Sequence, residues 1–343
     1  MRKLASIKQI AEVKSIPDAD KICAYRVDGW WVVDTVGKYR VGDLAVYCEV
    51  DSWIPNSLAP FLSKGQEPRE FEGVKGERLR TVRLRGQLSQ GLLLPYSTLM
   101  SKYEGEATST DWFCNQDVTE ELGILKYEAP VPAQLAGEVR GNFPGVIPKT
   151  DQERIQNLVK DLETWKSDNL LWEVTEKLDG SSMTVYVFDE DEGVCSRNLN
   201  LKETDTNSLW KLARKYDMIG KIRATGRNLA LQGEIIGEGI QGNPYKLKGQ
   251  DFYLFDIYDI DQGKYLTPHE RHDLVETMGI KHVPWISFTQ AMLDDTVETL
   301  LHEAEGKSKL CATTEREGLV FKCHDAKHSF KAISNKFLLK SGG

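Results

Sequence analysis

Short apolar runs separated by turn residues fill the first hundred residues of the chain. Segments 26–36, 44–50 and 81–94 have the composition of β-strands, and the run from Trp30 to Val33 is typical of a strand that is buried on one or both faces. The region shows little helical periodicity. Many short strands of this kind predict a small β-barrel.

Polar and apolar residues alternate in the segment from Thr81 to Gln90. An extended strand would place every second side chain on the same face. The alternation therefore predicts one face with Arg83, Arg85, Gln87 and Ser89 and another with Val82, Leu84 and Leu88. A strand face that carries two arginines could contact phosphates, and a solvated outer face explains the same pattern equally well.

The pattern changes after residue 145, where helical periodicity joins the strand signals. Thr150 to Glu153 have the sequence of a helix capping box, with Arg154 next to the N-terminus of the predicted helix, where the helix field attracts anions. The apolar residues that follow fall on one helical face: Ile155, Leu158, Val159, Leu162 and Trp165.

Strands and helices are both expected in the rest of the chain. Segments 182–188 and 194–198 flank an acidic turn and predict a hairpin, and further strands are predicted at 229–237, 251–259 and 317–323. Helices are predicted through 209–216 and from a capping box at Thr267, with Leu274, Val275 and Met278 as its core face. Strands with peripheral helices indicate an α+β domain of antiparallel sheets. We therefore predict a barrel domain at 1–125 and an α+β domain at 126–343.

Composition and charge limit the classes of protein that fit. The 343 residues are 40% hydrophobic and 28% charged, as in ordinary globular domains. No apolar run reaches roughly 18 residues and the N-terminus lacks a signal-peptide core, so neither a membrane span nor secretion is expected. The six cysteines form no zinc or redox spacing, which predicts free thiols in the cytoplasm or another reducing compartment.

The net charge of −8 argues against a protein that coats nucleic acid by bulk charge. Contact with nucleic acid would therefore need a local basic surface. One such cluster lies within eleven residues that include a single acid, Glu77: Lys75, Arg78, Arg80, Arg83 and Arg85.

The segment Glu-Lys-Leu-Asp-Gly at 176–180 carries the strongest chemical signal. It follows an apolar run, so Lys177 is expected in a tight, partly desolvated turn. A lysine becomes a nucleophile when it loses its proton, and burial or nearby positive charge favours that loss. Asp179 could orient the amine or a metal-bound water, and Gly180 lets the backbone approach a ligand. A surface turn between two strands is the alternative for this segment taken alone.

Five further segments follow in order: Cys-Ser-Arg-Asn (195–198), Leu-Gln-Gly-Glu-Ile-Ile-Gly (231–237), Phe-Tyr-Leu-Phe-Asp-Ile (252–257), Glu-Gly-Leu-Val-Phe-Lys (317–322) and Ser-Phe-Lys-Ala-Ile-Ser-Asn-Lys-Phe (329–337). The ordered set resembles the motifs of covalent nucleotidyltransferases, namely ATP-dependent RNA ligases, DNA ligases and mRNA capping enzymes. The resemblance covers about residues 145–340 and implies an ATP-grasp-like ligase domain.

The resemblance implies a role for each matching residue. Lys177 would attack the α-phosphate of ATP and form a lysine–AMP bond with release of pyrophosphate. Asp179 and Glu317 would hold a divalent metal, Mg²⁺ or Mn²⁺. Lys322 and Lys331 would bind the α-phosphate, and their charge would help to keep Lys177 neutral. The other ATP contacts implied are Arg197 and Glu234 at the ribose, Phe255 stacked on adenine, Glu176 at the adenine edge, and Arg154 and Leu178.

Two features of the chain qualify the resemblance. Related RNA ligases often carry Lys-x-Lys in the last motif, whereas this chain has Lys331-Ala332-Ile333, and Lys336 is not expected to replace the second lysine.

DNA ligases and capping enzymes place an OB barrel after the catalytic domain, and here the last motif lies close to Gly343. An N-terminal barrel, with Pro148–Arg154 before the lysine motif, is similar to the Naegleria-type and Deinococcus-type RNA ligases. The barrel would contact the ATP β- and γ-phosphates and RNA, which suits Arg80, Arg83 and Arg85.

The sequence thus predicts an ATP-dependent RNA ligase that joins 3′-OH and 5′-phosphate ends through lysyl-AMP and 5′-adenylylated RNA. We expect a monomer that acts on RNA, with no membrane contact. One alternative is a ligase of mixed RNA/DNA or DNA nicks. Another is a non-catalytic OB-fold nucleic-acid-binding protein with a decayed transferase domain. Covalent labelling of the protein by ATP separates the catalytic readings from the last one.

Three other motifs are set aside. Gly237–Gly242 matches the dinucleotide-binding pattern, but Asn-Pro-Tyr follows where that fold needs a helix. His269 and His272 lie three residues apart with no third metal ligand nearby in sequence, so two exposed histidines are expected. The acidic run 256–263 is better explained by a hairpin turn at 261–264 than by a calcium loop.

Overall fold

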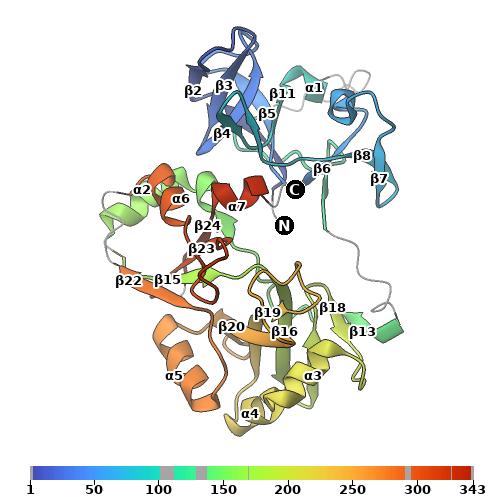
Figure 1. The fold of residues 1–343 in the computed structure, drawn as a ribbon, viewed down its shortest axis with the longest axis vertical. Helices are drawn as coiled ribbons and strands as arrows, with labels where there is room; N and C mark the ends of the chain where they lie inside the picture. Colours follow the sequence, from blue (N-terminus) through green and yellow to red (C-terminus); the bar gives the residue numbers. More distant parts are fainter. Residues whose placement is uncertain are drawn as a thin grey trace. The chain divides into compact units, whose positions relative to one another are not determined.

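The computed structural model describes residues 3–100, 112–128, 137–168, 170–289, 295–325 and 327–340. The chain forms two compact units (Figure 1). The first comprises residues 1–129, 156–159 and 338–343, and the second comprises 130–155 and 160–337. No helix in the described ranges is long and apolar enough to cross a membrane. The domain division at residue 125 stays a prediction.

The N-terminal unit is built from short antiparallel strands, as an OB-like fold requires. Its four sheets are β2 (Glu12–Ser15), β3 (Ile22–Val27) and β4 (Trp30–Thr35); β1 (Ala5–Gln9), β5 (Leu44–Cys48) and β11 (Leu92–Pro95); β12 (Leu125–Lys126), β6 (Ser52–Pro55), β8 (Val74–Arg78) and β7 (Arg69–Phe71); and the hairpin β9 (Val82–Leu84) with β10 (Gln87–Ser89). Among residues 3–100 and 112–128, the helices are short: η1 (Pro60–Ser63) and α1 (Ser97–Met100). Inward side chains such as Tyr25, Trp30 and Tyr47 are almost fully buried and form the core.

Two predicted strands of this unit are interrupted by turns. Segment 26–36 contains the turn between β3 and β4 at Asp28, whose φ is +47°. Segment 81–94 contains three strands, because Arg85 and Gly86 have φ values of +48° and +82°. Two successive residues with positive φ are the signature of a tight hairpin turn.

The predicted face of Arg83, Arg85, Gln87 and Ser89 is therefore wrong. Residues directly opposite in an antiparallel pair share a face, and Arg83 lies opposite Leu88 while Ser89 lies opposite Val82. Ser89 is buried and accepts a hydrogen bond from the amide of Val33 at 2.9 Å. Arg83 instead alternates with exposed apolar residues in a three-residue strand.

The second unit contains two antiparallel sheets with helices beside them (Figure 1). The seven-stranded sheet has the order β13 (Val139–Asn142), β18 (Leu199–Leu201), β17 (Asp191–Cys195), β16 (Ser181–Phe188), β19 (Leu229–Gly237), β20 (Gln250–Asp259) and β21 (Lys264–Tyr265). Helices α3 (Ser208–Lys215), α4 (Met218–Ala224) and α5 (Pro268–Met278) bury apolar side chains against this sheet.

The five-stranded sheet has the order β14 (Glu153–Arg154), β24 (Ser329–Ile333), β23 (Gly318–Cys323), β15 (Trp172–Lys177) and β22 (Trp285–Thr289), and only the pairing of β14 with β24 is parallel. Its back face packs on aromatic rings, with Trp165 of α2 (Val159–Ser167) stacked on Phe330 at 5.6 Å. Phe330 in turn stacks on Phe321 at 4.6 Å. Two more helices are α6 (Val297–Glu303) and α7 (Asn335–Lys340). The packed back face leaves the other face for the polar residues of the site.

Most elements predicted for this unit are confirmed. The 182–188 hairpin, the helix through 209–216, the strands at 229–237, 251–259 and 317–323 and the turn at 261–264 all form. The capping box at Thr267 is present, with Val275 and Met278 buried.

The helix predicted to start at Thr150 is wrong. Glu153 and Arg154 form strand β14 and pair with Phe330 and Lys331, and α2 starts only at Val159. Strand pairing with a distant segment outweighs the local capping signal here, and Arg154 is buried in the sheet rather than placed at a helix N-terminus.

Candidate active site

Strand register brings three of the predicted lysines onto one face of the five-stranded sheet. Lys177 ends β15 opposite Gly318, and Glu173 of the same strand lies opposite Lys322. Because side chains alternate along a strand, Lys177, Glu173 and Lys322 share a face. Lys331 lies opposite Val320 in β24 and joins that face. Strand register thus places the predicted nucleophile and both predicted phosphate-binding lysines on the same face.

Carboxylates surround Lys177. Its Nζ lies 2.7 Å from Oε1 of Glu317. Burial lowers the pKa of Lys177, but the charges of Glu317, Glu234 and Asp179 outweigh burial and raise it above the ordinary value. The charges that act on this amine come from carboxylates rather than lysines, and the prediction that neighbouring lysines help to keep it neutral stays a prediction.

The same crowding acts on the acids. Burial and then the charge of Glu317 raise the pKa of Asp179 to about 7. Burial, partly offset by Lys177, raises the pKa of Glu234 to about 8, and the charges of Glu317 and Asp179 add to the increase. Within the described residues, Oε2 of Glu317 is buried with no hydrogen-bond partner. Clustered carboxyl oxygens with an unused acceptor fit a hard divalent cation such as Mg²⁺ or Mn²⁺.

The turn after Lys177 is held by a residue that the sequence did not single out. The amide of Asp179 donates a 2.7 Å hydrogen bond to the hydroxyl oxygen of Tyr245, which is buried. A Cβ on Gly180 would lie 2.3 Å from the carbonyl oxygen of Ile235, so only glycine fits there. Tyr245 belongs to the glycine-rich segment after β19, which resembled a dinucleotide motif and gave no signal of this contact.

The predicted adenine-site residues lie around one apolar cluster. Leu178 is buried with Ile236, Tyr245 and Tyr253, and Phe255 packs against them. Glu176 is on the opposite face of β15, and its Oε2 accepts a 2.8 Å hydrogen bond from the amide of Lys309. This cluster supplies an aromatic and aliphatic wall beside the lysine turn.

Arg197 and Lys336 are engaged elsewhere. Arg197 donates to both carboxylate oxygens of Asp151 at 2.8 Å, and both residues line a cavity of about 10 Å³ with Ser182 and Thr184. Lys336 forms an ion pair with Glu305 at 2.7 Å; that it does not replace the second lysine of the last motif stays a prediction.

Lys322 belongs to a buried ionic cluster with Asp256 and Arg271, two residues for which the sequence predicted no role. Its Nζ lies 2.8 Å from Oδ2 of Asp256 and donates to the carbonyl oxygen of Phe255. Oδ1 of Asp256 contacts Nη1 of Arg271 at 3.5 Å. Asp256 lies within the motif at 252–257, but the sequence gave a role there only to Phe255, and Arg271 was predicted only as part of a helix.

His272 is not the exposed helix-start residue that its sequence position predicts. Its Nε2 lies 2.7 Å from Oε1 of Glu173, and metal-ligating atoms of Glu173, His272 and His282 lie within 4.8 Å of one another. Arg271 donates to both Glu173 and Nε2 of His282. The guanidinium therefore occupies one oxygen of Glu173 and Nε2 of His282, and the other Glu173 oxygen is paired with His272, so these atoms are already engaged without a metal.

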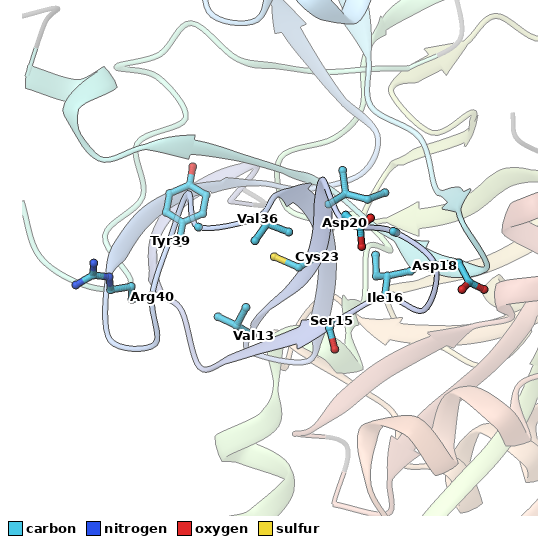
Figure 2. Close-up of a pocket in the computed structure, with 12 residues that line it drawn as sticks. Val13, Ser15, Ile16, Asp18, Asp20, Cys23, Val36, Tyr39 and Arg40 are labelled. Atoms are coloured by element: carbon cyan, nitrogen blue, oxygen red, sulfur yellow. The ribbon is translucent and has the colours of Figure 1, made fainter.

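Arg80, Arg83 and Arg85 belong to the N-terminal unit and are exposed; Nη1 of Arg83 donates to the carbonyl oxygen of Gly86 at 2.9 Å. That unit also contains a cavity of about 580 Å³, lined by Val13, Cys23 and Val36 among others (Figure 2). None of the predicted site residues lines this cavity, which is mainly apolar.

Comparison with known proteins agrees with this geometry. The RNA ligase family model matches residues 170–337, and an OB-fold domain model matches residues 4–96. Structures of Naegleria gruberi RNA ligase match with 50% identity over 98% of this chain, 98% of that chain and a TM-score of 0.89; they include a mutant with AMP and Mn, the protein with PPi, and a mutant with ATP and Mn. No match was found among curated proteins.

The OB-fold model matches within the first unit and the ligase model matches most of the second, which places the chain in the class of ligases with an N-terminal OB domain. The chain belongs to the RNA ligase family.

Proposed function

We propose that this RNA ligase uses ATP to join 3′-OH and 5′-phosphate RNA ends through lysyl-AMP at Lys177 and a 5′-adenylylated RNA. The ion pair of Lys177 with Glu317, at the centre of three carboxyl groups, is the observation that carries the proposal. Related structures hold ATP, AMP, PPi and Mn.

The chemistry at Lys177 requires loss of one proton before attack. Oε1 of Glu317 is within hydrogen-bond distance to accept it. The amine nitrogen then bonds to the α-phosphorus of ATP, and the bond from that phosphorus to the bridging oxygen breaks to release pyrophosphate. A divalent cation held by Asp179 and Glu317 would offset their charge and that of the phosphates.

The remaining proposed roles belong to residues on the sheet face that carries Lys177 and to residues of the apolar cluster beside it. Lys322 and Lys331 bind the α-phosphate. Arg154 lies opposite Lys331 in the parallel strand pair and binds ATP beside it. Phe255 and Leu178 contact adenine, with the backbone of Glu176 at its edge. Arg197 and Glu234 bind the ribose, which requires Arg197 to exchange Asp151 for the ligand.

The oligomeric state, the compartment and the substrate range are also proposals. We propose that the enzyme is a monomer, that it works in the cytoplasm or another reducing compartment, and that mixed RNA/DNA nicks are secondary substrates. All six cysteines lie in described residues and each is free. Light scattering tests the oligomeric state, and a ligation panel of RNA, mixed and DNA nicks tests the substrate range.

Labelling with ATP tests the central step. Wild-type protein incubated with α-labelled ATP and Mg²⁺ or Mn²⁺ should acquire a covalent label, and Lys177→Ala or Lys177→Met should acquire none. Lys160→Ala, which changes an exposed lysine of α2, should label normally. Undiminished labelling of both Lys177 variants would contradict the assignment.

A further inference from the structure

A row of four buried, alternately charged side chains runs through the catalytic unit. Its members come from four elements: Glu173 of β15, Arg271 of α5, Asp256 of β20 and Lys322 of β23. Their exposed fractions are 0%, 1%, 5% and 6% respectively. Arg271 contacts Glu173 through Nη2 and Asp256 through Nη1, and Asp256 contacts Lys322 at 2.8 Å. The row joins the two sheets, because Glu173 and Asp256 belong to different ones.

Such a row is costly for a fold that needs only stability. Burying charged groups carries a desolvation penalty that attraction between them often fails to repay, and apolar residues of similar size commonly stabilise as well or better. The buried groups must therefore be explained by what they position. Lys322 is the member with a proposed role in phosphate binding.

The two oxygens of Asp256 divide their contacts between the two cations. Oδ1 faces Arg271 and Oδ2 faces Lys322, whose ammonium also donates to the Phe255 carbonyl oxygen. Lys322 is thus held by two acceptors, and an ammonium has three donors. Fixing two of them directs the third.

Arg271 is itself held from several sides. Nε donates to Nε2 of His282 at 3.2 Å, and Nδ1 of His282 contacts the carbonyl oxygen of Val283 at 2.8 Å. Glu173 also accepts a contact from His272 at 2.7 Å. A guanidinium fixed at three edges is a rigid support for the Asp256 carboxylate.

We propose that Arg271 is a positioning residue for lysine adenylylation, which fixes Asp256 and through it the ammonium of Lys322. The proposal rests on the proposed function of Lys177 and Lys322. Arg271 does not touch ATP in this scheme. It acts by orienting a group that does, as outer-layer partners orient ligands in other sites.

The test uses Arg271→Lys, which keeps the charge and removes the planar fork. Single-turnover labelling with α-labelled ATP should be about 10- to 100-fold slower, the usual effect of losing such a partner. Arg227→Lys is the matched control, since Arg227 pairs with Asp259 at 2.6 Å on the same strand β20 but away from Lys322. It should label at the wild-type rate.

A double variant distinguishes positioning from general damage. If Arg271 acts through Lys322, Arg271→Lys combined with Lys322→Ala should label no more slowly than Lys322→Ala alone, because coupled residues are not additive. Multiplied losses in the double variant, or a wild-type rate in Arg271→Lys, would overturn the proposal.

Two further variants separate a folding defect, and a failure of the role proposed for Lys177, from a failure of the role proposed for Arg271. If Arg271→Lys does not fold, the double variant Glu173→Gln with Arg271→Gln removes both charges of that ion pair, which destabilises the fold less than removing one of them. This variant should label as slowly as expected for Arg271→Lys. A wild-type labelling rate in it would also overturn the positioning role of Arg271. Labelling of Lys177→Ala would instead refute the proposed function. Dependence on Lys177 with no dependence on Arg271 refutes only the positioning role.

Discussion

At the scale of single residues, the site is defined by excess negative charge around one amine. Three carboxyl groups keep the pKa of Lys177 raised, and burial raises the pKa values of Asp179 and Glu234. Raised in this way, the pKa of Lys177 favours the protonated amine. A divalent cation and the phosphates of ATP would change that balance, so chemistry and ligand binding are linked at these residues.

Glu317 is the residue at which this link can be tested. Glu317→Ala should slow labelling by about 10²- to 10³-fold, the usual effect of losing one electrostatic group at a reacting centre. ATP affinity, measured by calorimetry, should fall much less. Glu315→Ala is the control, since Glu315 pairs with Lys307 outside the cluster. Normal labelling by Glu317→Ala would show that the carboxylate is structural.

Tyr245 offers a second test at this scale. Tyr245→Phe leaves the Asp179 amide without its acceptor, and an unpaired buried donor costs about 1–3 kcal/mol. We expect lower thermal stability and slower labelling of Lys177. Tyr253→Phe, in the same apolar cluster, should change neither. Equal behaviour of the two variants would mean that the Tyr245 hydroxyl has no role in holding the turn.

At the scale of elements, strand register decides which residues meet. Periodicity and capping signals located most strands and helices of the second unit, since each depends on neighbours in sequence. The β9–β10 turn at Arg85-Gly86 was missed because alternation continues through it. The β14 strand was missed because its partner is 177 positions away in sequence (330 minus 153). The contacts of Asp256, Arg271 and Tyr245 were not predicted, because their partners come from distant segments.

The β9–β10 hairpin is the element that we expect to meet RNA. Arg83→Ala with Arg85→Ala should weaken RNA binding and flatten its salt dependence, because fewer counterions are released. Filter binding at several salt concentrations measures both. The control is Arg69→Ala with Lys75→Ala, which removes two cations already paired with Glu77 and Glu67. An unchanged salt slope in the hairpin variant would place the RNA contact on other residues.

At the scale of the whole molecule, the chain combines two units whose amino-acid segments interleave. Residues 156–159 belong to the N-terminal unit although the second unit surrounds them in sequence. Composition and patterning predicted an OB-like part and an α+β part. They could not predict this interleaving, because a four-residue segment carries no periodic signal of its own.

Acid stability is a property of the whole fold to which His282 contributes. Burial, with the charge of Arg271, lowers its pKa to about 3. The unfolded chain binds this proton below about pH 6.5, so the free energy of unfolding should fall as pH decreases from 6.5 toward 3. His282→Gln should remove up to about 1.4 kcal/mol per pH unit from that slope. Urea unfolding at pH 5.0, 5.5 and 6.5 measures it, and His269→Gln, an exposed control, should keep the wild-type slope.

The long separation between β15 and β23 also has a consequence during protein synthesis. Glu317, which pairs with Lys177, is added 140 positions after it (317 minus 177). At about 5–20 residues per second, translation needs roughly 7 to 28 seconds to cover that distance. A nascent chain therefore carries Lys177, the proposed nucleophile, for that time without Glu317 and without the lysines of β23 and β24. On the proposed mechanism, such a chain should not consume ATP or label itself before those strands have left the ribosome and paired.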